Sequence, residues 1–534
     1  MQVQTDPRPP APGGHAPATE PAPLLSLPAR IEAAARAHPD RPCLVEGTAP
    51  ERAGMSFAET WRAIEATAER LRRCGIGPED KVAVLSPNDP RVVVATVALL
   101  SLGAAWLPIN SRESTATIVA LLDRFGCDAL VVHPDLAAVA EDVVRAVAGL
   151  RGVLSLDDLM GASGEVAVLA PRGRGADPED RDLGAVFPTG GTTGRPKGVT
   201  FTHQRLAALA ECYATVLARP DDVYLAAAPL THVGGRICLS VIASGGTVVV
   251  LPGFDERAVL EAIQRHRITT LTVTSTMLYR LLDCPERSTF DTSSLRSLVY
   301  GGGPTAVSRV RQAIEAFGPV LEGGYGQTEA PMFITRLRPE DHIVDGLPAP
   351  DERLRSVGRQ TAVSEVRVVD DNGQEVPAGT TGRVLVRGPF TMSGYYRDPD
   401  ATAARRVGEF HSTGDIGFLD REGYLTLVGR ETDLIITGGF NVYPAEVENV
   451  IAAQPGVREC AVFGLPDERW GEVVVAVVSP EAGVRLDPDE LRGSVRPLLG
   501  GVKTPKRIEV VDELPRNDTG KILKRVLVEE RRTS

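Results

Sequence analysis

Apolar residues follow two different spacings in the N-terminal half of the chain. Three segments carry an apolar residue at every third or fourth position, the spacing of a helix with one buried face. They are Leu27–Ala37, Phe57–Cys74 and Arg205–Val216. Short continuous apolar runs, typical of buried strands, are Lys81–Ser86, Ala129–Val132, Gly246–Leu251 and Ile268–Val273. Helices that alternate with buried strands predict an α/β fold with parallel sheets.

The C-terminal part is richer in strand-like segments. Gly382–Val386 and Gly423–Val428 predict a β-rich portion. After Gly429 the pattern predicts an α+β unit of about a hundred residues, a plausible size for a small domain. Its expected elements are a helix from Ala445, strands near Cys460–Phe463 and Val473–Val478, a helix from Pro488 and a strand near Arg507–Val511.

The longest uncharged apolar run, Val92 to Ile109, has the length of a membrane span. Ser101, Gly103 and Pro108 interrupt it, so a buried helix that leads into a strand is favoured over a membrane helix. Residues 1–23 are rich in proline and alanine and lack the charged start and apolar centre of a signal peptide. We therefore expect a disordered tail and a soluble, cytoplasmic protein.

The length of 534 residues exceeds one ordinary core and favours a large domain with a smaller one. The formal net charge of -12 disfavours nonspecific attraction to nucleic acid, so no such partner is expected. Seven cysteines lack CxxC pairs and metal-ligand spacing, which favours reduced structural thiols. They are Cys43, Cys74, Cys127, Cys212, Cys238, Cys284 and Cys460.

The segment from Phe187 to His203, FPTGGTTGRPKGVTFTH, has the composition of a phosphate-binding loop. Its glycines let backbone N–H groups approach an anion, while hydroxyls and one lysine add donors and positive charge. These groups belong to Thr189, Gly190, Gly191, Thr192, Thr193, Gly194 and Lys197. The spacing is not GxxxxGK[ST], because Pro196 precedes the lysine and Gly198 follows it. Taken alone, the segment also fits a mobile turn.

Further motifs follow this loop in order along the chain. They are APLTHVGG around His232, GGGP at Gly301–Pro304, YGQTE at Tyr325–Glu329, TGD at Thr413–Asp415, and the segments Gly429–Glu448 and Leu514–Arg525. In order and spacing they resemble the motifs of the adenylate-forming superfamily, which includes acyl-CoA synthetases, firefly luciferase and the adenylation domains of nonribosomal peptide synthetases. The resemblance extends over nearly the whole chain and favours the branch of AMP-forming CoA ligases.

This resemblance implies a large N-terminal adenylate-forming domain, with two α/β subdomains and a distorted β-barrel, and a small mobile α+β C-terminal domain. We expect a disordered tail over residues 1–24, the adenylation core over 25–430 and a lid domain with the catalytic lysine over 431–534. The resemblance also implies an enzyme that uses ATP and Mg2+ to activate a carboxylic acid, and coenzyme A to accept the acyl group.

Three residues are expected, by this resemblance, to carry the chemistry. Attack of a carboxylate on the α-phosphorus of ATP brings two anions together, so the site must neutralise charge. Lys521 is expected to reach the carboxylate, the α-phosphate and the ribose; a solvated surface lysine is the alternative. Glu329 is expected to bind Mg2+ with the hydroxyl of Thr192 or Thr193, a helix-capping glutamate being the alternative. His232 is expected to position the carboxylate, although an isolated histidine would favour a core role.

The same motifs imply the nucleotide site. Asp415 should accept both ribose hydroxyls, because a carboxylate only accepts hydrogen bonds and suits a vicinal diol; a turn aspartate is the alternative. Arg430 is expected near the ribose and the phosphate. The remaining contacts, which include the enclosure of adenine by the glycines and the tyrosine ring, are expected from Gly301, Gly302, Gly303, Tyr325, Gly326 and Thr328.

The second half-reaction is expected to use rotation of the small domain about a hinge at Thr432. Gly438 and Gly439 should line the tunnel for the pantetheine arm, because glycines leave room for a thin ligand. CoA is the expected acceptor and a separate acyl carrier protein the alternative, since no fused carrier domain is recognisable. Val233 stands where amino-acid-activating relatives carry an aspartate, which disfavours a free α-amino acid. Aryl, fatty and polycyclic acids stay open, as does the oligomeric state.

Three positions depart from the family pattern: Pro188, where an aromatic residue is common, Gly190, where serine is usual, and Thr432, where aspartate or lysine is common. Gly190 removes a hydroxyl from the phosphate loop, although TGGTTG resembles a variant found in actinobacterial fatty-acyl and steroid-acyl ligases. Two other functions stay open. One is an ATP-dependent diazotase that activates nitrite, and the other is a nucleotide-binding protein without catalysis.

Overall fold

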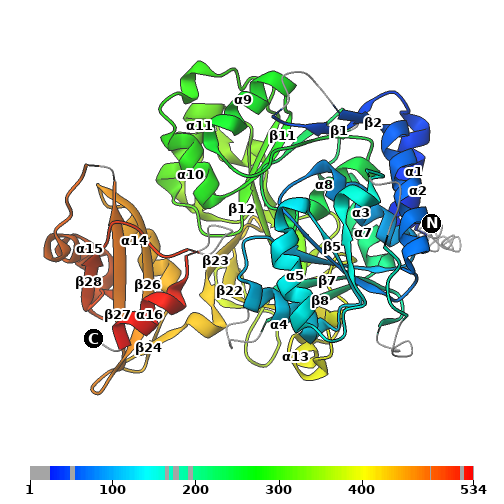
Figure 1. The fold of residues 1–534 in the computed structure, drawn as a ribbon. Helices are drawn as coiled ribbons and strands as arrows, with labels where there is room; N and C mark the ends of the chain where they lie inside the picture. Colours follow the sequence, from blue (N-terminus) through cyan, green and yellow to red (C-terminus); the bar gives the residue numbers. More distant parts are fainter. Residues whose placement is uncertain are drawn as a thin grey trace, which may run out of the picture.

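The computed structural model describes residues 24–48, 54–162, 167–171, 180–189, 196–219, 221–481, 483–516 and 522–532. Figure 1 shows a large body, which contains the N-terminal and central parts of the chain, and a small body at the left, which the C-terminal part forms. The predicted tail over residues 1–24 lies almost entirely outside the described residues.

One sheet of the large body has seven strands in the order β20-β8-β7-β4-β3-β5-β6. The strands are β3 (Lys81–Ser86), β4 (Ala105–Asn110), β5 (Ala129–Val132), β6 (Val153–Ser155), β7 (Leu183–Thr189), β8 (Lys197–Thr202) and β20 (Gly394–Tyr395). The five strands β7, β4, β3, β5 and β6 pair in parallel, whereas β7 and β8 form an antiparallel pair. The predicted phosphate loop joins that pair. The two predicted strands β3 and β5 are confirmed with their bounds.

The other sheet has nine strands in the order β17-β14-β13-β12-β11-β9-β10-β1-β2. They are β1 (Pro42–Glu46), β2 (Gly54–Ser56), β9 (Val223–Ala226), β10 (Thr247–Val250), β11 (Thr270–Thr274), β12 (Ser297–Gly301), β13 (Leu321–Gln327), β14 (Ala330–Leu337) and β17 (Arg359–Gln360). The six strands from β13 to β1 in this order pair in parallel, and the outer strands are antiparallel. The predicted strands Gly246–Leu251 and Ile268–Val273 are therefore confirmed, with small shifts at their ends.

Helices fill the space between the two sheets and cover their outer faces (Figure 1). The shared core holds α1 (Leu27–Ala37), α2 (Phe57–Cys74), α3 (Pro90–Ser101), α7 (His203–Val216) and α8 (Val233–Ala243). The nine-stranded sheet is covered by α9 (Glu256–His266), α10 (Ser275–Asp283) and α11 (Val307–Phe317). The seven-stranded sheet is covered by α4 (Thr115–Phe125) and α5 (Ala137–Ala146). Layers of helix on parallel sheet are the predicted α/β arrangement.

Local sequence explains where these helices begin and end. Ser56 and Glu59 form a capping box before α2, and Gly75 ends that helix with a φ of 93°. α3 begins at Pro90, after the Asp89 carboxylate accepts a hydrogen bond from a backbone N–H of the first turn. Because α3 is buried on all sides and leads into β4, the helix-then-strand interpretation of this apolar run is confirmed. Among the described residues, no helix is long and apolar enough to cross a membrane.

A five-stranded antiparallel sheet completes the large body where the sequence predicts a β-rich portion. Its strands are β18 (Glu365–Val369), β19 (Gly382–Arg387), β21 (Arg406–Val407), β22 (Phe410–Leu419) and β23 (Leu425–Arg430). β22 pairs with β19, β21 and β23 and is the central strand. The short elements of the large body are α6 (Leu156–Leu159), which packs against α2 and α3, and β15 (Ile343–Val344), β16 (Leu347–Pro348), α12 (Asp351–Arg355) and α13 (Pro399–Ala404).

The small body has its own sheet and its own apolar clusters. Its strands are β24 (Ile435–Thr437), β25 (Phe440–Val442), β26 (Val457–Asp467), β27 (Gly471–Pro480) and β28 (Arg507–Val510). Its helices are α14 (Pro444–Ala452), α15 (Pro488–Lys503) and α16 (Lys524–Arg532). Each C-terminal element that the sequence predicts is present, and β26 extends well beyond the predicted segment because it pairs with β27 along its length.

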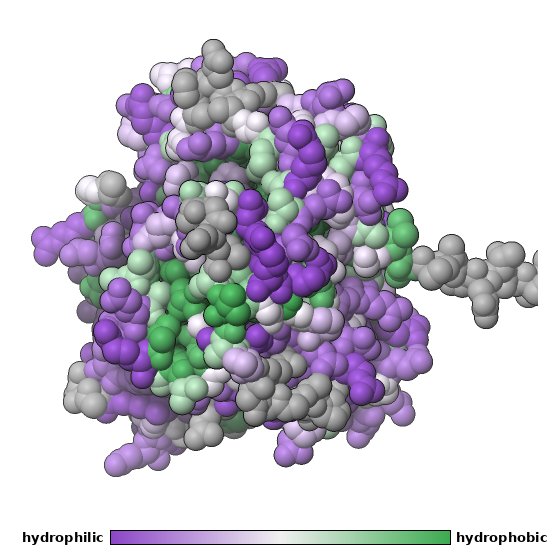
Figure 2. Space-filling view, turned by 45° about the vertical axis from the view of Figure 1, so that its right-hand side comes forward, coloured by the Kyte–Doolittle hydropathy of each residue, from purple (hydrophilic) through white to green (hydrophobic). Residues whose placement is uncertain are grey.

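The surface and the cysteines agree with the composition. Figure 2 shows a largely hydrophilic face on which apolar residues gather in limited patches. All seven cysteines are free thiols, and only Cys460 is not fully buried. Burial raises the pKa of Cys43 and Cys127 to about 12, which suppresses the reactive thiolate form. The cysteines therefore act as packing residues of the core.

Candidate active site

The nucleotide motifs meet because the strands that carry them are neighbours. Gly301, at the end of β12, lies opposite Gly324 of β13 in a parallel pair. Asp415 of β22 lies opposite Arg430 of β23. Gln327, at the end of β13, donates a hydrogen bond from its side chain to the backbone oxygen of Thr413 at 3.2 Å. Ligand sites of α/β proteins form beyond the carboxyl ends of parallel strands, and this site follows that rule.

Asp415 is the centre of a buried cluster on the side predicted to bind ribose. Asp415 is only 6% exposed to solvent. The Tyr325 hydroxyl donates to one carboxylate oxygen at 2.5 Å, and Arg430 Nε donates to the other at 3.1 Å. The Asp415 backbone N–H donates to the Thr413 hydroxyl at 3.1 Å. The cluster holds the carboxylate in place, and each of its oxygens keeps a second lone pair for a hydroxyl donor.

The pKa directions in this cluster follow from burial and charge. Burial, and then the Asp415 carboxylate, raise the pKa of Tyr325 well above its usual value, so this phenol stays a donor. Burial opposes the charge on Arg430, but the neighbouring Asp415 and Asp433 carboxylates raise its pKa overall. A neutral phenol and a charged guanidinium therefore face one carboxylate.

The glycine segment before the cluster is shaped by close backbone approach. A Cβ on Gly301 would lie 2.3 Å from the backbone oxygen of Gly324, a distance that no side chain tolerates. Gly302 has a φ of 78°, which favours glycine. Gly303 accepts a hydrogen bond from the Ser275 hydroxyl at 3.0 Å. This bare segment beside Tyr325 fits the predicted face for a flat adenine ring.

Glu329 is held by residues that the motifs do not contain. The Tyr395 hydroxyl donates to Glu329 Oε1 at 2.8 Å, and the Met392 backbone N–H donates to the Glu329 backbone oxygen at 2.7 Å. In the described part of the chain, no donor contacts Oε2, which fits a carboxylate that offers one oxygen to Mg2+. The described residues hold no cluster of three or more His, Cys, Asp or Glu that could bind a metal. A hydrated Mg2+ shared with phosphates needs no such cluster.

The ends of the phosphate loop reach the same place. Lys197, at the start of β8, places its ammonium 4.8 Å from the centre of the Tyr395 ring, a cation–π arrangement. The Thr189 hydroxyl donates to the Lys197 backbone oxygen at 3.3 Å and closes the base of the loop. Gly190, Gly191, Thr192, Thr193 and Gly194 lie outside the described residues, as does Lys521. Gly326 and Thr328 lie in and just after β13, beside Glu329.

Arg236 is a buried cation in α8, one helical turn after His232. Its guanidinium stacks on Phe187 at 4.4 Å, and Nη1 donates to the Thr328 backbone oxygen at 3.4 Å. Burial lowers the pKa of Arg236 to about 10, so it stays charged at neutral pH. His232 directly precedes α8 and Val233 is its first residue, which places both one helical turn before Arg236.

The small body presents the predicted CoA-tunnel glycines in the turn between β24 and β25. Gly438 and Gly439 have φ values of 58° and 81°. A Cβ on Gly438 would lie 2.8 Å from the Trp470 ring, whereas one on Gly439 would meet nothing within 4 Å. The predicted hinge residue Thr432 is exposed and donates to the Asp433 carboxylate at 3.0 Å.

One described link between the bodies comes from the segment that precedes Lys521. Arg516 Nη1 donates to the Thr276 hydroxyl of α10 at 2.8 Å. Thr276 follows Ser275, which bonds Gly303. The C-terminal motif therefore begins next to the glycine segment of the nucleotide site.

The side chains that the sequence analysis missed lie far from their partners along the chain. Tyr395 is separated from Glu329 by 66 positions and belongs to a different sheet. No local spacing links the two residues. The Gly-Tyr-Tyr sequence at Gly394 marks only a short strand.

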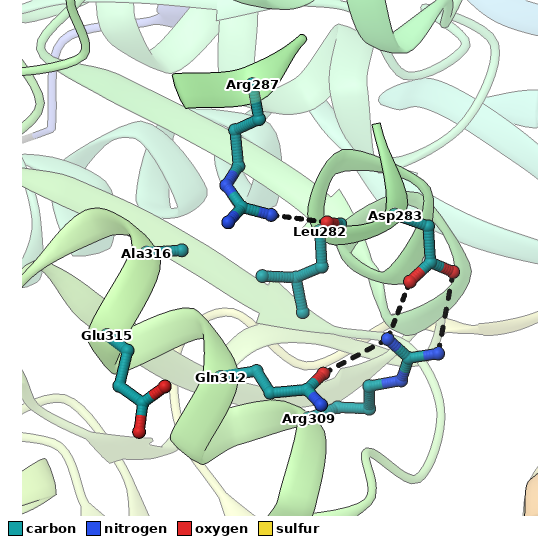
Figure 3. A pocket seen from close by; sticks show the side chains of 7 residues that line it. All are labelled: Leu282, Asp283, Arg287, Arg309, Gln312, Glu315 and Ala316. Atoms are coloured by element: carbon teal, nitrogen blue, oxygen red, sulfur yellow. Dashed lines mark hydrogen bonds and ion pairs between the residues drawn. The ribbon is translucent and has the colours of Figure 1, made fainter. Parts of the chain in front are cut away.

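A surface pocket of about 340 Å³ lies elsewhere, between α10 and α11 (Figure 3). Arg309 there donates to the Asp283 carboxylate at 2.7 Å and to the Gln312 side chain at 3.1 Å. Arg287 donates to the backbone oxygen of Leu282. Both arginines therefore have hydrogen-bond partners in the pocket wall, and none of the nucleotide motifs belongs to the described lining. We assign no function to it.

Comparison with known proteins identifies the motifs independently. The profile described as "AMP-binding enzyme" matches residues 31–396, and the one described as "AMP-binding enzyme C-terminal domain" matches residues 446–521. A feruloyl-CoA synthase from Amycolatopsis sp is 38% identical over 475 residues, covering 88% of this chain and 92% of the relative. A medium/long-chain-fatty-acid CoA ligase from Mycobacterium tuberculosis is 34% identical over 508 residues, covering 91% of this chain and 87% of the relative.

Solved structures share the architecture of both bodies. The amide bond synthetase McbA from Marinactinospora thermotolerans is 34% identical and has a TM-score of 0.82, covering 93% of this chain and 99% of that chain. The predicted α/β class, with a large N-terminal and a small C-terminal part, is thereby confirmed.

Proposed function

Because the chain belongs to the AMP-binding enzyme family, we propose that it is an AMP-forming acid:CoA ligase. The resemblance derived from the motifs is confirmed by both profile matches. The observation that carries the proposal is the Asp415 cluster beside Glu329, which brings four strands of the core to one place. Close relatives are named as CoA ligases, which supports the acid and thiol substrates.

In the proposed first half-reaction, a carboxylate oxygen attacks the α-phosphorus of ATP. A bond forms between that oxygen and phosphorus, the bond to the β-phosphate breaks, and pyrophosphate leaves with the electron pair. Asp415 would hold the ribose, Glu329 would bind Mg2+ with Thr192, and Lys197 with the loop glycines would hold the phosphates. Lys521 would neutralise the approaching carboxylate and α-phosphate, and His232 would position the carboxylate.

In the proposed second half-reaction, the part from residue 431 onward acts as a lid. Rotation about Thr432 would break the contact between Arg516 and Thr276 and withdraw Lys521. The turn at Gly438 and Gly439 would then line the path of the pantetheine thiol. The thiol would attack the acyl carbonyl, AMP would leave, and a thioester would form.

We propose the acid substrate and the acyl acceptor as chemical classes. The names of relatives support an aryl or a fatty acid as the substrate. A polycyclic acid is the third class to be tested. Val233, in place of an acidic side chain at the start of α8, argues against an α-amino acid. CoA is the proposed acceptor; a carrier-protein thiol, or an amine as the name of McbA suggests, would follow the same adenylation.

The test is release of AMP and pyrophosphate from ATP with Mg2+, with and without CoA, across aryl, fatty and polycyclic acids. We expect a thioester in the mass spectrum only when CoA is present. Acyl-adenylate that accumulates whether or not CoA is added would move the acceptor to a carrier protein or an amine. AMP formation that depends on nitrite would favour a diazotase, and ATP binding without turnover for any substrate would reject the ligase.

A further inference from the structure

A second pocket, of about 330 Å³, lies behind Glu329, and its lining includes three arginines and a histidine. Its lining joins the start of α7, the segment just before β20, and the stretch from the end of α13 through β21 to the start of β22. The basic groups come from Arg205, Arg405, Arg406 and His411. We call this cavity the basic pocket.

In the described part of the chain, the arginines of the basic pocket have no carboxylate partner. Arg205 donates to the backbone oxygen and the hydroxyl of Thr391, at 2.5 and 3.3 Å, and Arg406 is exposed. Over the described ranges of the chain, none of the three arginines forms an ion pair with a carboxylate. Glu409 is the one acidic residue among the described residues of the lining, and its carboxylate pairs with Arg387. Three guanidinium groups thus share a cavity without an ion-pair partner among the described residues.

Two groups of the lining have lowered pKa values, with burial as the main cause and neighbouring positive charge as a lesser one. Burial lowers the pKa of Arg205, and the positive charge of Arg406 lowers it further. His411 is 9% exposed, and its Nε2 has no hydrogen-bond partner among the residues that the structure describes. Burial lowers the pKa of His411 to about 4, so the imidazole is neutral at physiological pH. A buried polar atom without a partner costs free energy, and an anion that entered the pocket would supply one.

The basic pocket shares a wall with the proposed metal and phosphate site. Met392 lines the pocket, and its backbone N–H donates to the Glu329 backbone oxygen at 2.7 Å. The positive charge of Arg405 acts on the Tyr395 hydroxyl and lowers its pKa against the effect of burial, and this hydroxyl donates to Glu329 Oε1 at 2.8 Å. The guanidinium of Arg405 also lies against Gly414, and a Cβ on that glycine would collide with Arg405 Nη1. One tyrosine ring therefore separates the pocket from the carboxylate that would hold Mg2+ beside the phosphates.

We propose that the basic pocket binds a diphosphate group, namely the pyrophosphate that adenylation releases. The terminal phosphates of bound ATP are the other source of the same chemistry. The inference rests on the proposed ligase function, since that reaction breaks the bond between the α- and β-phosphates beside Glu329. Arginine suits this ligand because its planar fork pairs two oxygens of a phosphate. Removal of pyrophosphate from the metal site would disfavour reversal of the first half-reaction.

Equilibrium dialysis of the full chain with radiolabelled pyrophosphate and Mg2+ tests the proposal without a known acid. Arg406→Ala and Arg205→Ala should each weaken pyrophosphate binding about tenfold, because each removes a charge-assisted contact. Arg205→Lys keeps the charge and should restore part of the binding. Arg421→Ala, at an exposed position in the turn after β22, is the matched control and should bind as the wild type does. Thermal unfolding of each variant identifies any that is misfolded.

A parallel dialysis with a non-hydrolysable ATP analogue distinguishes the two sources. Loss of pyrophosphate binding alone assigns the pocket to the released product, and an equal loss for the analogue assigns it to the terminal phosphates of ATP. Unchanged binding of both ligands in Arg406→Ala and Arg205→Ala overturns the proposal. The result is independent of the ligase test: pyrophosphate can bind through these arginines although no acid yields AMP, and AMP can form although the variants bind pyrophosphate normally.

Discussion

The side of the site proposed to bind ribose (the ribose side) and the C-terminal body proposed to act as a lid (the lid) differ in how their side chains are held. Asp415 is buried and its carboxylate is held by Tyr325 and Arg430 at once. The glycine turn of the lid is flanked instead by exposed apolar side chains, with Phe440 61% and Trp470 42% exposed. A preorganised site stabilises charge without rearrangement, whereas exposed apolar surface is available for a later contact.

This difference predicts how substitutions will divide between the two half-reactions. Changes on the ribose side should impair every step that needs the nucleotide. Changes in the lid should impair one half-reaction and spare the other, because the lid is proposed to serve each in a different orientation. The predictions below test that division, beginning with the largest effect.

Lys521→Ala should reduce adenylation about 10³-fold, because it removes the cation proposed to meet the carboxylate and the α-phosphate. Acyl transfer from a supplied acyl-adenylate to CoA should change little. The measurement is pyrophosphate release with acid, compared with thioester formation from the adenylate. Lys524→Ala is the control: Lys524 pairs with Glu448 at 2.7 Å in the same segment, and its loss should cost less than threefold. Equal losses in both half-reactions would contradict the division.

Asp415→Asn should lower kcat/KM for ATP about 10²-fold, because two charge-dependent hydrogen bonds are weakened and Arg430 loses its buried counter-charge. Both half-reactions should suffer, in contrast to Lys521→Ala. Steady-state kinetics with varied ATP, and AMP binding by calorimetry, measure the effect. Asp371→Asn, an exposed carboxylate of the same sheet region, should behave as the wild type. Normal AMP affinity in Asp415→Asn would remove the ribose role.

The fold was predictable from the sequence where its causes are local. The bounds of α1 and α2 follow from an amphipathic spacing and from caps such as Ser56 and Gly75. α7 begins at His203 rather than at the expected Arg205, because the Thr202 hydroxyl accepts the Arg205 backbone N–H at 3.2 Å. A single cap residue therefore extended the helix beyond its apolar pattern.

The candidate site was predictable only through motifs, since its contacts are tertiary. The positions of Asp415 and Tyr325 follow from resemblance, but nothing near either residue indicates that they share a hydrogen bond across 90 positions. Tyr395 and the basic pocket give no local signal, because Arg205 belongs to α7 and His411 to β22, which lie about 200 positions apart in the sequence. Pairing of distant strands decides such contacts, and the pairing depends on the whole fold.

Acid should destabilise the large body selectively, because every histidine of the chain precedes the lid. Burial lowers the pKa of His411 from 6.5 to about 4 and also lowers that of His203 and His342. As pH falls below 6.5, the unfolded chain takes up the proton before the folded chain does. The stabilisation is therefore complete above pH 6.5 and is lost toward pH 4. His411 alone should account for roughly 2 kcal/mol between pH 6.5 and 5.

Urea unfolding at pH 7 and pH 5 measures this loss, and His411→Gln should reduce the difference between the two pH values. Trp470 is the lid's tryptophan, whereas Trp61 and Trp106 lie in the large body. The emission of Trp470 in a variant without the other two should show a lid transition that is less sensitive to pH. An equally pH-sensitive lid would mean that the two bodies unfold as one unit.

Gly438→Val should give the smallest but most selective effect. The φ of 58° at this position is strained for a branched side chain, and a Cβ would press on Trp470 at 2.8 Å. If this turn lines the path of the pantetheine thiol, thioester formation should fall about tenfold while acid-dependent pyrophosphate release stays within about twofold. Gly493→Ala, in α15 with nothing within 4 Å of the added Cβ, should alter neither rate. A parallel fall in both rates would assign the turn a structural role, and no fall in either would place the thiol path elsewhere. Only a slower thioester formation with normal pyrophosphate release supports a lid that acts in one half-reaction, in contrast to the ribose side.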